Sequence, residues 1–352
     1  MYQSLLRPLL FRLDAEVAHH LGMWGLSLAD TAPGLAKWAR RRAIPERSTL
    51  KMHLAGLDFP NPVGLAAGLD KNAEAIVGLF SLGFGSVEVG TVTPRPQPGN
   101  DKPRLFRLKE HQALINRMGF NNEGMQAMAS RLRELEWRPG PVGVNIGKNK
   151  DTPLEAAVDD YVKCAQLLSP LADYVVVNLS SPNTPGLRQL QEPEALSLLL
   201  QAVREHVVGR PLFLKIAPDL GDEAIDAVVD VANDCDTDGL ICSNTTITRP
   251  VEHPLAKEAG GFSGRPLFTR STEVVRRAFR RTDGKLPVIG VGGIFNGEDA
   301  WKKICAGASL VQVYSGFIYE GPGLVKEILD TLESKVSELG LTSLAAAVGR
   351  DA

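Results

Sequence analysis

Residues 212–243 read LFLKIAPDLGDEAIDAVVDVANDCDTDGLICS, and this stretch decides the fold. Leu212 to Ala217 and Gly239 to Ser243 are short runs that are largely apolar on both faces, which is typical of strands in a parallel sheet covered by helices. Between them, Asp222 to Ala232 has apolar residues at helical spacing. The stretch therefore predicts a strand, a helix and a second strand that runs parallel to the first.

The same alternation recurs along most of the chain beyond residue 60. Eight units of this kind favour a closed (β/α)8 TIM barrel over an open sheet, and one such barrel with a small appendage accounts for 352 residues. The predicted strands are Pro62 to Ala67, Ser86 to Val92, Val142 to Gly147, Tyr174 to Leu179, Leu212 to Ala217, Gly239 to Ser243, Pro287 to Gly292 and Leu310 to Tyr314. The predicted helices are Glu123 to Leu135, Thr152 to Leu168, Pro193 to Val208, Asp222 to Ala232, Thr269 to Phe279, Gly297 to Ala306 and Pro322 to Val336.

Two further segments of the predicted barrel domain, residues 46–340, interrupt this alternation. Asn100 to Leu114 has no strong helix pattern and is expected to be a long functional loop. Leu50 to Leu54 and Leu57 to Phe59 flank Ala55-Gly56, which predicts a hairpin that plugs the bottom of the barrel. Residues 341–352 are expected to form a C-terminal tail.

Residues 1–45 lie outside the alternation and are expected to form a small helical extension. Their apolar residues fall on one side of a helical wheel, and the pattern leaves two interpretations open. The stripe could pack on the barrel, or it could lie on a membrane surface, as Arg7, Arg12 and Arg40 to Arg42 beside Trp24 and Trp38 would favour. The stripe consists of Leu5, Leu6, Leu9, Leu10, Leu13, Val17, Leu21, Trp24 and Leu28.

Charge and cysteine content exclude several classes of protein. A net charge of −2 lacks the basic surplus that binds a nucleic-acid backbone, so no nucleic-acid partner is expected. The four cysteines, at 164, 235, 242 and 305, form no CxxC pair, so no metal site is expected. The cysteines themselves are expected to be buried in a protein of a reducing compartment. No apolar run is long enough to span a bilayer, and the start lacks a secretory cleavage pattern, so the protein is expected to stay inside the cell.

Polar residues end each predicted strand, where the active site of such a barrel forms. One amide or hydroxyl alone would be a turn or capping residue, but their recurrence at one rim indicates a binding site. The rim residues are Ala67-Gly68-Leu69-Asp70-Lys71, Gly90-Thr91, Asn145, Asn178 to Asn183, Lys215, Ser243 to Thr246, Gly292-Gly293 and Tyr314-Ser315-Gly316.

The last two strand ends indicate a phosphate site. Gly292-Gly293 opens toward a helix and Tyr314-Ser315-Gly316 follows the next strand, which is the usual position of a barrel phosphate site. A dinucleotide fold is rejected, because Gly290 to Gly293 lacks a third glycine and comes late in the chain.

Amides, hydroxyls and the lysines Lys71 and Lys215 suit a planar polar ligand with an anionic group and not metal-assisted hydrolysis. An aldolase-type lyase with a Schiff base on Lys215 is the alternative.

Several long motifs of this chain resemble those of the dihydroorotate dehydrogenases, specifically the class 2, quinone-linked, membrane-associated form. The resemblance runs from Met1 to the final helix. The motifs are GLAAGLDK at 64–71, GTVTPRPQPGN at 90–100, NRMGFNN at 116–122, NLSSPNTPG at 178–186 and GVGGI at 290–294.

The resemblance implies that the protein oxidises (S)-dihydroorotate to orotate in pyrimidine biosynthesis, with FMN as cofactor and no metal. Ser181 would be the catalytic base, where class 1 relatives carry cysteine. The implied FMN-binding residues are Ala67, Gly68, Leu69, Asp70, Lys71, Thr91, Asn145, Asn178, Lys215, Ser243, Gly264, Gly293, Tyr314 and Ser315. The implied substrate-binding residues are Lys71, Asn116, Arg117, Met118, Gly119, Phe120, Asn178, Asn183, Asn244 and Thr245.

The resemblance also implies the electron acceptor and the location. The acceptor would be a membrane quinone, ubiquinone or menaquinone, with His19 and Arg107 beside the quinone tunnel and residues 1–45 on the lipid surface. A monomer that binds peripherally to the cytoplasmic face of the bacterial inner membrane is expected. At Ser243 the family commonly has threonine, and because the hydroxyl is kept, FMN binding is expected to survive the difference.

Overall fold

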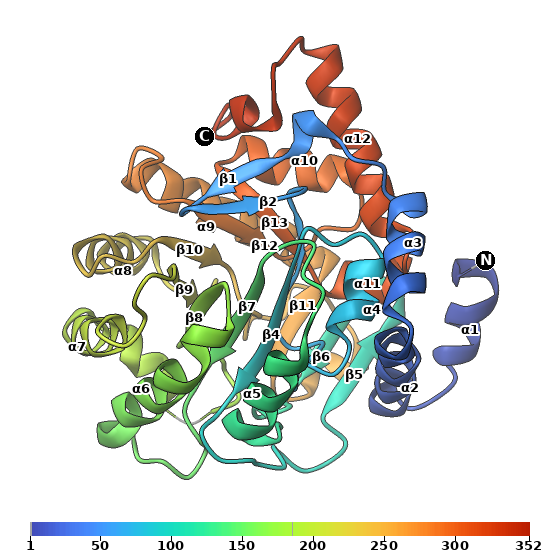
Figure 1. Ribbon diagram of the computed structural model, residues 1–352. Helices are drawn as coiled ribbons and strands as arrows, with labels where there is room; N and C mark the ends of the chain where they lie inside the picture. Colours follow the sequence, from blue (N-terminus) through green and yellow to red (C-terminus); the bar gives the residue numbers. More distant parts are fainter. Residues whose placement is uncertain (1, 185) are drawn as a thin grey trace.

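A closed barrel of eight parallel strands forms the centre of the protein, and helices surround it (Figure 1). The computed structural model describes residues 2–184 and 186–352. Around the barrel the strands follow in the order β3, β4, β7, β8, β9, β10, β12 and β13, and β13 pairs back with β3. The predicted (β/α)8 fold with N-terminal helices is confirmed.

All eight predicted strands and all seven predicted helices are present, with ends that shift by up to a few residues. The barrel strands are β3 (Val63–Leu65), β4 (Ser86–Val92), β7 (Val142–Ile146), β8 (Tyr174–Asn178), β9 (Leu212–Ile216), β10 (Gly239–Cys242), β12 (Val288–Val291) and β13 (Ala308–Val313). The seven helices are α5 (Gly124–Glu134), α6 (Ala157–Leu168), α7 (Pro193–Arg204), α8 (Asp222–Asp234), α9 (Phe268–Arg281), α10 (Gly297–Cys305) and α12 (Leu324–Glu338).

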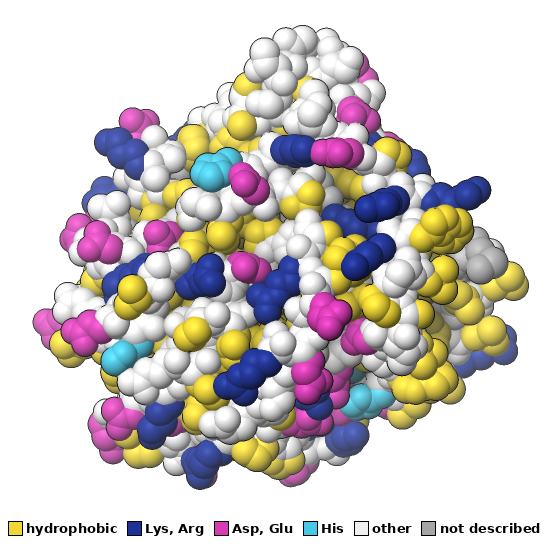
Figure 2. Space-filling model, in the orientation of Figure 1, with side chains coloured by type: hydrophobic (Ala, Val, Ile, Leu, Met, Phe, Trp, Pro, Cys, Tyr) yellow, Lys and Arg dark blue, Asp and Glu magenta, His cyan; other side chains and the backbone are white. Residues whose placement is uncertain are grey.

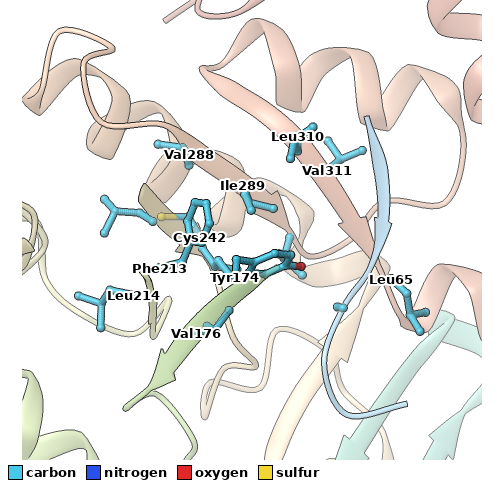
Figure 3. Packing of buried hydrophobic residues seen from close by; sticks show 14 of the residues in the cluster. Leu65, Tyr174, Val176, Phe213, Leu214, Cys242, Val288, Ile289, Leu310 and Val311 are labelled. Atoms are coloured by element: carbon cyan, nitrogen blue, oxygen red, sulfur yellow. The ribbon is translucent and has the colours of Figure 1, made fainter. Parts of the chain in front are cut away.

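The core of the barrel consists of close-packed side chains from neighbouring strands (Figure 3). The rings of Tyr174 on β8 and Phe213 on β9 meet edge to face with centroids 5.4 Å apart, and both residues are buried. Gly143 leaves room for this pair, because a Cβ there would lie 2.1 Å from the Tyr174 ring. Side chains thus fill the barrel toward the ends where its strands begin, and the cavity described below lies toward the carboxyl ends of the strands.

The segment predicted to be a loop, Asn100 to Leu114, contains regular structure instead, so that prediction is wrong. β5 (Leu105–Leu108) and β6 (Ala113–Asn116) form an antiparallel sheet with β11 (Gly261–Gly264), which was not predicted either. Short strands with half-buried residues or glycines at their ends give no clear alternation in the sequence. The short helices α4 (Ile76–Ser81) and α11 (Ser315–Glu320) were also missed.

The predicted hairpin before the barrel is confirmed as β1 (Met52–Leu54) and β2 (Leu57–Phe59). Met52, Leu54 and Phe59 are buried and belong to the main core. The hairpin lies at the end of the barrel where the strands begin (Figure 1). The last segment of the chain also packs on this core, through Leu344 and Ala347.

At one side of the barrel, the N-terminal segment forms the short helical turns Tyr2–Leu6 and Leu28–Thr31 and three α-helices (Figure 1). These are α1 (Arg7–Leu10), α2 (Ala15–Ser27), which Asp14 caps, and α3 (Pro33–Ala43). The predicted apolar stripe faces outward, so the interpretation that it packs on the barrel is wrong. Apolar side chains gather over this side of the molecule in Figure 2, and the exposed ones are Leu5, Leu6, Leu9, Leu13, Val17, Leu21, Trp24, Leu28, Leu35 and Trp38.

Candidate active site

A single cavity at the carboxyl ends of the barrel strands collects most of the predicted site residues. It encloses about 1040 Å³ of space free of protein atoms, part of which is open to solvent. The predicted residues that line it are Ala67, Gly68, Lys71, Thr91, Asn116, Met118, Gly119, Phe120, Asn178, Ser181, Asn183, Lys215, Ser243, Asn244, Thr245, Gly264, Gly293, Tyr314 and Ser315.

Amides and hydroxyls on neighbouring strands form a hydrogen-bonded network at the base of this cavity. The Asn178 amide donates to Thr91 Oγ1 at 2.9 Å and to Asn145 Oδ1 at 3.0 Å. Asn244 donates to Ser180 Oγ at 2.9 Å and lies 3.3 Å from Asn178 Oδ1. Because each side chain holds the next, the network presents a rigid set of donors and acceptors to a ligand.

Lys215 projects from β9 into the cavity and is 4% exposed. Burial lowers the pKa of its ammonium group, and the carboxylate of Glu88 on β4, 3.9 Å away, opposes that effect. The same carboxylate accepts hydrogen bonds from Asn145 and Gln312. A cation at this position would attract the electron-rich part of a bound ligand.

Lys71 lines the same cavity, and its charge acts on His19 of the N-terminal helix α2. Burial lowers its pKa to about 8, so a modest rise in pH removes the charge. The half-buried His19 on α2 has its pKa lowered to about 3 by burial and by the charge of Lys71, and it is therefore neutral at physiological pH. The two side chains connect the N-terminal segment with the rim of the barrel.

Ser181 follows β8 and lines the cavity with a 6% exposed side chain. Its Oγ accepts a hydrogen bond from the backbone N–H of Asn183 at 3.3 Å. The Asn183 amide in turn donates to the Asn116 carbonyl at 3.1 Å, which joins the loop after β8 to the end of β6. The hydroxyl is thus fixed beside the amides that would contact a substrate.

The predicted phosphate rim forms where β12 and β13 end. Gly293 has a φ of +75°, and a Cβ there would lie 2.4 Å from Phe268 Cα, so only glycine fits. Ser315 begins α11 and its hydroxyl lies 2.9 Å from that of Ser263 on β11. Backbone N–H groups and two hydroxyls in one corner are a suitable arrangement for a phosphate group.

Some predicted residues do not line the cavity. Asp70 accepts hydrogen bonds from the backbone N–H groups of Glu74 and Ala75, Leu69 belongs to the core, and Asn145 lies behind Thr91. Arg117 pairs with Glu258 at 2.6 Å. Arg107 stacks on Phe11 and donates to backbone carbonyls of Leu10 and Leu13, so it contacts the N-terminal segment at a distance from the barrel cavity.

Three polar residues in or next to the site were not predicted from the sequence: Ser263 and Gln312, which line the cavity, and Glu88, whose carboxylate lies 3.9 Å from the Nζ of Lys215. Glu88 is a charged residue in the middle of an otherwise apolar strand, and that pattern could have indicated it. Gln312 in β13 carries the same kind of pattern. No sequence pattern indicated Ser263, because its strand β11 was not predicted.

The shape and chemistry of the cavity suit a flat cofactor with a phosphate tail. The phosphate rim lies at one end, and amides with the Lys215 cation lie along the floor. The fold and this site together are those of a (β/α)8-barrel enzyme whose cavity suits a planar, polar, phosphate-bearing ligand.

Comparison with known proteins identifies the family. Residues 49–336 match the family model described as dihydroorotate dehydrogenase. A dihydroorotate dehydrogenase (quinone) of Myxococcus xanthus is 59% identical over 99% of this chain and 97% of its own, and one of Deinococcus radiodurans is 52% identical over 99% and 100%. A crystal structure of DHODH from Eimeria tenella in complex with ferulenol superimposes with a TM-score of 0.87 at 40% identity, over 96% of this chain and 95% of the other.

The chain belongs to the dihydroorotate dehydrogenase family. The resemblance drawn from the sequence motifs is thereby confirmed, including the quinone-linked class. The aldolase-type alternative, with a Schiff base on Lys215, is overturned by this membership.

Proposed function

We propose that the barrel cavity binds FMN and dihydroorotate together, and that the protein oxidises dihydroorotate to orotate and passes the electrons to a quinone. One observation carries the proposal. The phosphate rim, Lys215, the side chains of Thr91, Asn178 and Asn244, and Ser181 line the same cavity, although they are far apart in the sequence. The family supports dihydroorotate as the substrate and a quinone as the acceptor.

The cofactor would lie across the floor of the cavity. Its phosphate would accept hydrogen bonds at Gly293 and Ser315, and its ring would contact Thr91, Asn178 and Lys215. FMN supplies the acceptor for a hydride, which the side chains of this chain cannot supply themselves. Asn145, behind the lining residues, would hold Thr91 and Asn178 in position.

Dihydroorotate would lie above the ring, between the loop Asn116–Phe120 and the side chains of Asn183 and Asn244. The Lys71 ammonium group would pair with the carboxylate of the substrate. Oxidation removes a hydride from C6 and a proton from C5. Ser181 Oγ would take the C5 proton while its own proton passes to Thr184 or to water, because a free serine hydroxyl is a poor base.

The N-terminal helices would connect the site with the lipid bilayer. Among residues 2–184 and 186–352, no helix combines the length and the apolar character needed to cross a membrane. The exposed apolar side chains of α1–α3 would instead rest on the cytoplasmic face of the inner membrane, and ubiquinone or menaquinone would enter past His19 and Arg107. The active form would be a monomer.

The visible absorption spectrum of the purified protein tests the proposal. A flavin band that bleaches when dihydroorotate is added without oxygen, and returns when a soluble ubiquinone analogue follows, is the expected result. A protein that shows no flavin band, even after incubation with FMN, would refute the assignment of cofactor and site.

A further inference from the structure

A buried carboxylate lies inside the barrel beneath the cavity and carries no role in the reaction described above. Glu88 on β4 is 0% exposed. Its Oε1 accepts a hydrogen bond from Asn145 at 2.8 Å and its Oε2 accepts one from Gln312 at 2.7 Å, so the carboxylate is held from two sides. Its Oε1 also lies 3.9 Å from the Nζ of Lys215.

The surroundings of Glu88 and Lys215 make the Glu88 carboxylate important for the charge of Lys215. The other polar side chains across the floor, those of Asn178, Ser243 and Gln312, carry no charge. Tyr174, an ionisable side chain that also interacts with Glu88, has its pKa raised well above the ordinary value by burial and by Glu88, and remains a neutral phenol. Glu88 is therefore the charged group that acts on Lys215 among the described residues.

A buried lysine without a counter-charge tends to lose its proton. Desolvation lowers the pKa of Lys215, and Glu88 raises it. The two hydrogen bonds from Asn145 and Gln312 fix the carboxylate, so its distance from Lys215 cannot adjust freely. The geometry thus provides a fixed negative charge that favours the ammonium form.

We propose that Glu88 is a positioning residue that keeps Lys215 charged beneath the cofactor and thereby sets the affinity of the bound cofactor for electrons. The inference rests on the proposed function, since it requires FMN above Lys215. Two-electron reduction leaves a negative charge on the flavin ring, which a neighbouring ammonium group stabilises and a neutral amine does not.

The inference predicts a difference in proton uptake. In the native protein Lys215 is already protonated, so reduction of the cofactor draws in one proton per two electrons. Without the carboxylate, Lys215 is neutral in the oxidised protein above its lowered pKa and takes up a proton when the cofactor is reduced. The count then becomes two protons per two electrons.

The experiment is a redox titration of the flavin in the holoprotein between pH 6 and 9.5, for the native chain and for Glu88→Gln. The substitution keeps the shape of the side chain. Gln312 can accommodate the new amide by rotating, because its buried Oε1 has no hydrogen-bond partner within residues 2–184 and 186–352 and can accept from it. The expected result is a potential that falls twice as steeply with pH in the variant over the upper part of this range.

Tyr174→Phe is the matched control, because it removes a polar atom beside Glu88 and leaves the charge in place. Its potential should follow the native dependence. If Glu88→Gln is purified without flavin, Glu88→Asp replaces it: the carboxylate is drawn back from Lys215, and the steeper region should appear within the same pH range.

The outcomes separate this inference from the proposed function. A native protein without flavin overturns both. If the native protein carries flavin but the potential of the Glu88→Gln or Glu88→Asp variant falls with pH at the native slope throughout, only the role of Glu88 is overturned.

Discussion

The contact between α2 and the segment before β5 gives the sharpest stability prediction. Arg104 donates to both carboxylate oxygens of Glu16, at 2.7 and 3.2 Å, and the two side chains are 8% and 6% exposed. Its remaining nitrogen donates to the carbonyls of Pro98 and Asn100. Glu16→Gln would leave the guanidinium group buried without its charge partner, which costs about 3 to 5 kcal/mol in such pairs.

We expect the lower end of that range, since Lys102, 3.4 Å from Glu16, can turn to solvent once the carboxylate is gone. Unfolding of the FMN-loaded protein in urea should therefore show a loss of about 3 kcal/mol for Glu16→Gln. In the double variant Glu16→Gln/Arg104→Met no unpaired charge remains, so its loss should be clearly smaller than the sum of the two single losses. Additive losses, or a loss under about 1 kcal/mol for Glu16→Gln, would contradict this account.

The Glu16–Arg104 pair also predicts the direction in which the stability of the protein changes with pH. Burial raises the pKa of Glu16, but the hydrogen bonds and charge of Arg104 outweigh it and hold that pKa below the ordinary value. The stabilisation is therefore complete above the unfolded-state pKa of about 4.3, and is lost as the pH falls through the folded-state value. In Glu16→Gln this part of the acid-induced loss of stability should be absent.

Four further predictions follow from the site, the core and the surface. Ser181→Ala should keep FMN bound while stopped-flow reduction by dihydroorotate slows by roughly two to four powers of ten, and near-native rates would remove Ser181 from the mechanism. The kcat/KM for dihydroorotate should decline above pH 8 or so as Lys71 loses its proton, and Lys71→Met should lack that decline. Phe213→Ala should lower the unfolding free energy by about 3 to 5 kcal/mol in urea titrations. Leu21→Glu with Trp24→Glu should weaken sedimentation with lipid vesicles and leave the melting temperature within a few degrees of native, whereas unchanged vesicle binding would exclude this face.

The barrel was predictable because its strands are buried on both faces. Runs such as Tyr174 to Leu179 are continuous and apolar, and each is bounded by turns and followed by a helical pattern. β5 lacked this property: three of its four residues are half-buried, and Arg107 interrupts it, so the segment resembled a loop. Local pattern is informative only where burial on both faces makes it regular.

The residues of the site were also predictable only in part. The strand-end rule placed Lys215, Asn178 and Ser181 correctly in one cavity, because strand direction alone fixes which residues meet at the rim. It could not distinguish neighbours along a loop. Asp70 stands beside Lys71 in the sequence, yet its carboxylate turns back to the start of α4, and that choice depends on backbone N–H groups that only the folded chain brings near.

The outward-facing helix α1 has a consequence for the order of events during synthesis. Its contacts with the barrel domain come from the far end of the chain: Arg7 of α1 donates to the carbonyl of Tyr319, and Tyr2, which precedes α1, donates to that of Ile318. At translation rates of roughly 5 to 20 residues per second, those partners leave the ribosome about 15 to 60 seconds after α1 does. During this interval the apolar N-terminal segment has no barrel to dock on, and we expect a bilayer or a chaperone to be its first partner.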